Sequence, residues 1–290
     1  MTEPKTQTLE VPGAKLRYDI RDPEIGDGAP TLLMIGLPMA ADGFTALAGH
    51  FGDRTVVTYD PRGVARSERT DPSWESTPEL HAEDLNKLIS ALGAGPVEIL
   101  ASSGGAVNGL ALVAKHPEQV RTLVAHEPPA AEVLPDREEA LAAVNDICDT
   151  YQREGIGPAM ARFMALTSLK GPIPANLFDQ PLPDPAAFGL PTEDDGSRDD
   201  PMFGQNMVAV THHQHDFDAL RAASTRLVIG AGVESEGEMA HRAALAVAEH
   251  LGQEPVIFPS HHGGFLDGSF GWKGDPDGFA AKLREVLNEP

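Results

Sequence analysis

The sequence predicts an α/β protein with a mostly parallel, doubly wound sheet and an inserted, mainly helical cap. Short apolar runs of strand length alternate with stretches whose apolar residues recur at helical spacing. Strands that alternate with helices form parallel sheets covered on both faces. The alternation stops near the middle of the chain and later resumes. We therefore expect a core of residues 1–128 and 221–290 and a cap of residues 129–220, a length in the range of small domains.

The elements before the cap follow from local patterns. Thr77 and Pro78 have the residue types that begin helices, as a cap and as a first helical residue. Pro12-Gly13 separates two short strands, as in a hairpin. We expect these two strands within 8–20, further strands at 31–37, 55–60, 97–102 and 121–128, and helices at 43–51, 77–93 and 105–116.

The cap and the end of the chain have different patterns. Proline and aspartate are so frequent in residues 171–201 that regular structure is not expected there. A long irregular segment inside a compact fold is usually functional, so a lid over a site is expected. We expect cap helices near 136–153 and 157–169, then core strands at 225–232 and 254–260, with helices near 237–251 and 276–288.

Charge and cysteine content exclude several classes of partner and site. Forty-four acidic against 22 basic residues give a formal net charge of -22, which repels nucleic acid and anionic lipid. The first ten residues lack the layout of a secretory signal, so we expect a cytoplasmic protein with no membrane partner. Cys148 is the single cysteine, which excludes an internal disulfide and a cysteine-based zinc cluster. A homo-oligomer remains open.

A serine between the strand at 97–102 and the following helix is the candidate nucleophile. A sharp strand-to-helix turn displays a hydroxyl but crowds the chain, so the residues two before and two after it must be small. Ser103 meets this demand because Ala101 and Gly105 flank it. Ser102 does not, because Leu100 would occupy the first crowded position. The pattern is G-x-S-x-G with alanine in place of the first glycine.

These residues, with two further loops, resemble the α/β-hydrolase superfamily over nearly the whole chain apart from the cap. Residues 60–67 (DPRGVARS) are similar to the D-x-R-G-x-G-x-S loop of that family, with Ala65 in place of a glycine. Residues 35–39 (IGLPM) are similar to its H-G-x-P loop, with isoleucine in place of histidine. The resemblance implies an oxyanion hole, by position the amides of Leu37 and Gly104, the second at a helix N-terminus.

The resemblance also implies a histidine base in the loop between the last strand and the last helix. His262 is preferred over His261 because the Gly-Gly-Phe that follows it matches an H-x-G-F pattern. The acid is expected after the preceding strand, where Glu234 is preferred, with Glu236 and Glu238 close behind. Glu127, at the end of the strand at 121–128, is the alternative acid. Both choices agree with the order serine, acid, histidine.

Together these residues imply a cytoplasmic serine hydrolase, an esterase or lactonase with a Ser-His-Glu triad and an acyl-enzyme, acting on a largely apolar small molecule. A carbon–carbon bond hydrolase, a cofactor-free perhydrolase and a non-catalytic hydrolase-like binding protein are the alternatives. No nucleotide motif indicates a cofactor. His212, His213 and His215 lack partners in a metal-binding pattern, so no metal is expected. The candidate substrate pocket comprises Met39, Phe163, Met164, Phe203, Met207 and Phe265.

Overall fold

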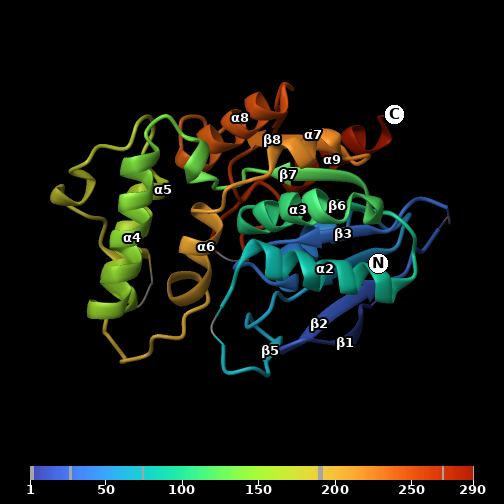
Figure 1. Ribbon diagram of the computed structural model, residues 1–290, viewed down its shortest axis with the longest axis horizontal. Helices are drawn as coiled ribbons and strands as arrows, with labels where there is room; N and C mark the ends of the chain where they lie inside the picture. Colours follow the sequence, from blue (N-terminus) through green and yellow to red (C-terminus); the bar gives the residue numbers. More distant parts are fainter. Residues whose placement is uncertain (1–2, 26–27, 74, 189–191, 270, 290) are drawn as a thin grey trace.

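The computed structural model describes residues 3–25, 28–73, 75–188, 192–269 and 271–289, and its centre is one mostly parallel sheet (Figure 1). The strand order is β1-β2-β4-β3-β6-β7-β8-β9, and β5 pairs with β2. The pairs from β4 to β9 are parallel, whereas β2 is antiparallel to its neighbours. The strands are β1 (Lys5–Val11), β2 (Ala14–Arg21), β3 (Leu32–Ile35), β4 (Val56–Tyr59), β5 (Glu68–Arg69), β6 (Val97–Ser102), β7 (Val120–His126), β8 (Arg226–Gly232) and β9 (Val256–Phe258).

Helices cover both faces of this sheet, which confirms the predicted fold class. Alternate strand residues point to opposite faces, so Leu33 and Ile99 pack in one apolar cluster while Leu32 and Leu100 pack in another. The first cluster includes residues of α2, α3 and α8, and the second includes residues of α1 and α9. The helices are α1 (Thr45–Ala48), α2 (Pro78–Leu92), α3 (Gly104–Lys115), α4 (Arg137–Glu154), α5 (Ile156–Thr167), α6 (Met207–Thr211), α7 (Phe217–Ala222), α8 (Met239–Leu251) and α9 (Pro276–Asn288).

Most of the expected elements occur, and the helix predicted at 43–51 is the main exception. There the chain makes a 3-10 turn, η1 (Ala41–Phe44), followed by the single helical turn α1. Helix α2 begins as predicted, because the Thr77 hydroxyl accepts a hydrogen bond of 3.3 Å from the amide of Leu80. Part of the segment 171–201, residues 189–191, lies outside the described residues.

The segment between β7 and β8 contains α4, α5, α6 and α7. Figure 1 shows α4 and α5 standing beside the sheet, with α6 between them and α3. Helix α7 instead packs on α3 and α8. The boundary expected at residue 220 falls inside α7, so we assign α7 to the core and end the inserted segment before Phe217.

Polar contacts at two places fasten the inserted segment to the core. Arg242 of α8 pairs with Asp136 before α4 and donates a hydrogen bond of 2.8 Å to the carbonyl of Gly171. On the other side, Asn206 contacts the Ser76 hydroxyl, which lies 2.8 Å from Nε2 of His81. These contacts are buried or half-buried, where polar groups without partners are costly. They fix the segment next to the carboxyl ends of the strands.

Candidate active site

Ser103 lies on a strained turn between β6 and α3. Its φ of 56° and ψ of −128° are rare for a residue with a side chain, and such strain clusters at functional sites. A Cβ atom on Gly105 would lie 2.7 Å from the Cα atom of Gly36, so only glycine fits there. Ala101 fits at the other crowded position because the residue that faces it is Gly109, which has no side chain. A Cβ atom on Gly109 would lie only 3.2 Å from the Cβ atom of Ala101. The turn therefore requires small residues two positions before and two positions after Ser103, as the sequence pattern predicts.

Leu37 and Gly104, the two predicted oxyanion donors, are neighbours. A Cβ atom on Gly104 would lie 2.8 Å from the carbonyl oxygen of Leu37. Within the described ranges, neither backbone amide donates a hydrogen bond to a protein acceptor. Gly104 is the first residue of α3, whose dipole favours negative charge at that end. The two amides are thus available to an anion beside Ser103.

The buried carboxylate of Glu127 forms the central ion pair of the site. Oε2 of Glu127 lies 2.6 Å from Nδ1 of His262, and the Glu127 side chain is fully buried. Glu127 follows β7 with a φ of 47°, and its amide donates to the carbonyl of Gly230 on β8. This left-handed backbone conformation turns the side chain toward the end of β8.

The second oxygen of Glu127 is held by the loop after β8. Oε1 accepts a hydrogen bond of 2.8 Å from the amide of Gly232 and another from the hydroxyl of Ser235. Burial alone would raise the pKa of Glu127, but the hydrogen bond and charge of His262 outweigh it and hold the pKa at about 2. The carboxylate is therefore ionised at neutral pH and fixed at both oxygens. Sequence reasoning missed Ser235, which follows the preferred acid directly.

Glu234, the preferred acid, does not contact His262, which corrects that prediction. Its side chain is exposed, and its carboxylate accepts a hydrogen bond of 3.4 Å from the hydroxyl of Ser260. The chain turns after β8 so that Ser235 points inward and Glu234 outward. The alternative acid, Glu127, makes the contact instead. Glu236 is exposed, and Glu238 precedes α8 without capping it.

His261 makes contacts within its own loop, whereas the neighbouring His262 faces Glu127. Nδ1 of His261 accepts a hydrogen bond of 3.0 Å from the amide of Gly263, so its Nε2 carries the proton that faces the carbonyl of Lys273 at 3.1 Å. His261 thus holds the loop together. His262 bonds to Glu127 through Nδ1, so in the neutral imidazole Nε2 is the nitrogen that can accept a proton.

The backbone of β7 connects this pair to Ser103. The amide of Ser103 donates a hydrogen bond of 3.0 Å to the carbonyl of His126, the residue before Glu127. The rings of His126 and His262 have centroids 6.3 Å apart. No hydrogen bond joins the Ser103 hydroxyl to His262 in the described part of the chain. Catalytic hydrogen bonds often form only once substrate is bound.

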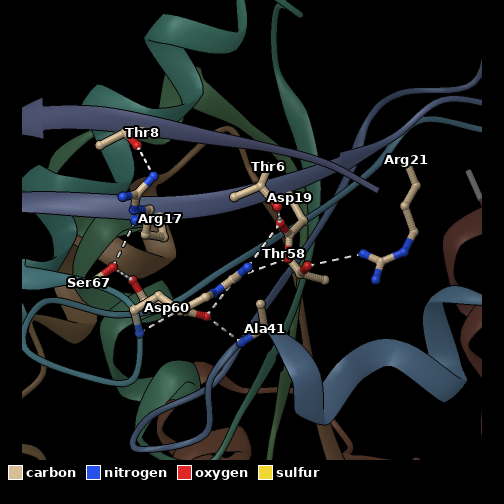
Figure 2. A network of polar contacts seen from close by, with 10 residues as sticks. Thr6, Thr8, Arg17, Asp19, Arg21, Ala41, Thr58, Asp60 and Ser67 are labelled. Carbon is tan, nitrogen blue, oxygen red and sulfur yellow. Dashed lines mark hydrogen bonds and ion pairs between the residues drawn. The ribbon is translucent and has the colours of Figure 1, made fainter. Parts of the chain in front are cut away.

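Asp60 ties the loop after β3 to the loop after β4 (Figure 2). Its Oδ1 accepts a hydrogen bond of 3.0 Å from the amide of Ala41, four residues beyond Leu37. Its Oδ2 accepts hydrogen bonds from the amide and from Nε of Arg66, at 3.1 and 2.6 Å. Asp60 is 1% exposed. The acid of the D-x-R-G-x-G-x-S pattern thus holds the loop that carries Leu37, the first predicted oxyanion donor.

Asp60→Asn is expected to lower the free energy of unfolding by about 1–3 kcal/mol. The amide group cannot accept at both positions, so one buried donor, at Ala41 or Arg66, is left facing an N–H group. Urea unfolding measures the change. Asp42→Asn, at an exposed neighbouring carboxylate, serves as the control and should stay within about 0.5 kcal/mol of wild type. Equal stability of the two variants would contradict the role of Asp60.

His126 makes the stability of the protein sensitive to acid. It is fully buried between Phe258 and Phe279, and neither ring nitrogen has a hydrogen-bond partner among the described residues. Burial lowers its pKa to about 4. The unfolded chain takes up this proton near pH 6.5, but the folded chain does so only near pH 4. The free energy of unfolding is therefore unaffected by this proton above pH 6.5. It decreases as the pH falls from 6.5 toward 4, because only the unfolded chain binds the proton there.

His126→Phe is expected to reduce this loss. Between pH 7.5 and pH 4.5 the wild type should lose about 2 kcal/mol more unfolding free energy than the variant, because phenylalanine takes up no proton. Urea unfolding of both proteins at the two pH values measures the difference. An equal loss in the two proteins would show that His126 is not the group responsible.

The six residues predicted to line a substrate pocket belong to different packing clusters. Met39 and Phe265 pack with the helices on one face of the sheet, whereas Phe163, Phe203 and Met207 pack with α4 on the other. Met164 is half-buried on α5. A different apolar cluster joins the first oxyanion residue to helices α3 and α6. Its members are Leu37, Ala40, Val64, Val107 and Val210.

The histidines of residues 212–215 have local partners. His213 lies 3.4 Å from a carboxylate oxygen of Glu79, and its ring packs edge-on against His215. Across the ranges that the structure describes, no three side chains of His, Cys, Asp or Glu are grouped as the ligands of a metal ion. In the same ranges, no helix has the length and apolar character needed to cross a membrane.

Comparison with known proteins identifies the family. A family model described as the alpha/beta hydrolase fold matches residues 30–187. An uncharacterized hydrolase from Bacillus subtilis (strain 168), YraK, is 30% identical over 265 residues, which cover 89% of each protein. The chain therefore belongs to the alpha/beta hydrolase family, as the sequence motifs predicted.

Solved structures agree in fold. An esterase from Thermogutta terrifontis is 20% identical with a TM-score of 0.65, and the match covers 99% of this chain and 98% of that one. An enol-lactonase from Burkholderia xenovorans LB400 is 18% identical with a TM-score of 0.67, covering 98% of this chain and all of that one. At these identities the likeness concerns the fold alone.

Proposed function

We propose that this hydrolase uses Ser103, His262 and Glu127 as a catalytic triad to cleave an ester or lactone bond in a largely apolar small molecule. The observation that carries the proposal is the buried pair of Glu127 and His262 beside the strained turn of Ser103. A structural ion pair does not need an adjacent serine in a strained conformation. Proteins described as an esterase and an enol-lactonase share this fold, so we propose this class of bond.

The proposed mechanism assigns one role to each group. His262 takes the proton of the Ser103 hydroxyl through Nε2 while the serine oxygen attacks the carbonyl carbon. The amides of Leu37 and Gly104 stabilise the oxyanion, each contributing a few kcal/mol to the barrier reduction. His262 then gives its proton to the leaving oxygen, and water releases the acyl group by the same steps. Glu127 stabilises the imidazolium throughout.

The inserted segment is proposed to act as the cap. Its residue Val210 belongs to the apolar cluster with Leu37 of the oxyanion loop and Val107 of α3, one turn after Ser103. An apolar wall beside the nucleophile suits a substrate with an apolar acyl or alcohol part. We propose that the protein acts in the cytoplasm and needs no cofactor for this chemistry.

A panel of aryl esters, lactones, methyl esters and a carbon–carbon substrate tests the proposal. We expect turnover of p-nitrophenyl esters or lactones with covalent labelling by a fluorophosphonate probe. Labelling with turnover of the carbon–carbon substrate alone would change the proposed bond class. Neither labelling nor turnover of any compound would contradict the catalytic proposal and favour a binding protein on the same fold.

A further inference from the structure

A cavity of about 560 Å³ lies apart from Ser103, His262 and Glu127. Residues of β2, of the loop after β3 and of the loop after β4 line it. Arg21, Asp19 and Asp60 are the buried charged residues in its wall, and Glu3, Asp42 and Arg66 are exposed there. The proposed hydrolytic chemistry uses none of these side chains.

Arg21 is a buried cation in this wall without a carboxylate partner. Its side chain is 7% exposed, and its Nη1 donates one hydrogen bond of 3.2 Å to the hydroxyl of Thr58. Among the described residues, no carboxylate oxygen lies within 4.0 Å of its guanidinium. Burial lowers the pKa of Arg21, and the charges of Asp19 and of the more weakly acting Glu3 offset this only in part. A buried cation with one neutral partner is unusual, because desolvation of the charge is costly.

Figure 2 shows Arg21 beside Asp19, Thr58 and Asp60, and both carboxylates already bind Arg66. Asp19 accepts hydrogen bonds from both terminal nitrogens of Arg66, at 2.9 and 3.2 Å, and one from the hydroxyl of Thr6 at 2.5 Å. Asp60 also bonds to Arg66. Arg66 therefore satisfies both carboxylates while Arg21 keeps N–H groups free for a ligand in the cavity.

We propose that this cavity binds the carboxylate of a small organic acid through Arg21. A guanidinium presents its N–H groups as a planar fork that matches the two oxygens of a carboxylate. The lining sets Arg21 and Arg66 against the carboxylates of Glu3, Asp19, Asp42 and Asp60. A ligand with a single negative charge is therefore favoured over a dianion, which the exposed Glu3 and Asp42 and the net charge of -22 would repel more strongly.

Isothermal titration with butyrate tests this site, with chloride at equal ionic strength and n-butylamine as comparison ligands. We expect saturable binding of butyrate to the wild type, at least tenfold weaker binding to Arg21→Met, and weaker binding to Arg21→Lys, which keeps the charge but loses the fork. Arg17→Met is the matched control, because exposed Arg17 lies on the same strand and also donates to a threonine hydroxyl. It should bind butyrate as the wild type does.

Several results would overturn the proposal. They are absence of butyrate binding to the wild type, equal binding of n-butylamine, or Arg21→Met binding as tightly as Arg17→Met. If Arg21→Met does not fold, Arg21→Lys replaces it in the test. Butyrate binding by Arg21→Lys as tight as by the wild type would then contradict the proposal. Butyrate bound beside Ser103 would survive the Arg21 substitutions, so this site is distinguished from the catalytic one. Aryl ester hydrolysis in Arg21→Lys reports on the proposed function separately.

Discussion

Ser103→Ala is expected to lower kcat for a p-nitrophenyl ester by roughly 10⁴- to 10⁶-fold and to abolish labelling by a fluorophosphonate probe. Alanine removes the only atom that can form the acyl-enzyme, while the amides of Leu37 and Gly104 remain. The small residual rate comes from those amides and from binding. Steady-state kinetics and mass spectrometry of the probe-treated protein measure the two effects.

Ser102→Ala is the matched control for this experiment. Ser102 is the adjacent residue, is buried at the end of β6, and has no hydrogen bond from its hydroxyl among the described residues. Its substitution should change kcat by less than about threefold. Labelling that persisted in Ser103→Ala and disappeared in Ser102→Ala would move the nucleophile by one position and contradict the proposed mechanism.

The sheet was predictable because its signals are local. Buried parallel strands appear as short apolar runs, and helix α2 begins at Pro78 after its cap Thr77, as the capping pattern predicts. Helix α1 was overestimated because an apolar spacing does not reveal how the chain packs after a single turn. Strand β5, only two residues long, and the turn of π-helix at Met202–Asn206 have no such local signal.

The strained turn at Ser103 was predictable for the same reason, since steric crowding acts on the residues adjacent to it. The carboxylate that contacts His262 was not. Whether Glu127 or Glu234 reaches His262 depends on a left-handed backbone conformation at Glu127 and on the direction of the turn after β8. The packing of the six candidate pocket residues was not predictable either, because they belong to clusters on different faces of the sheet and residue type does not encode a face.

Glu127→Gln is expected to lower kcat by roughly 10³- to 10⁴-fold, the size that replacement of a triad acid by its amide produces in other hydrolases. Both oxygens of Glu127 accept hydrogen bonds, one from the Gly232 amide and Ser235 hydroxyl and the other from His262. Glutamine has one oxygen, so the amide of Gly232 holds that oxygen and turns the NH₂ group toward His262. Nδ1 must then accept, and the proton moves to Nε2.

His262 in that tautomer cannot take a proton from Ser103, so kcat falls while KM for the ester changes little. Glu234→Gln is the control, because its exposed carboxylate contacts Ser260 and not the imidazole, and its kcat should stay within about threefold of wild type. Kinetics across the pH range measure both variants. A large loss in Glu234→Gln with a normal rate in Glu127→Gln would restore the acid that the sequence favoured and require the loop after β8 to rearrange when substrate binds.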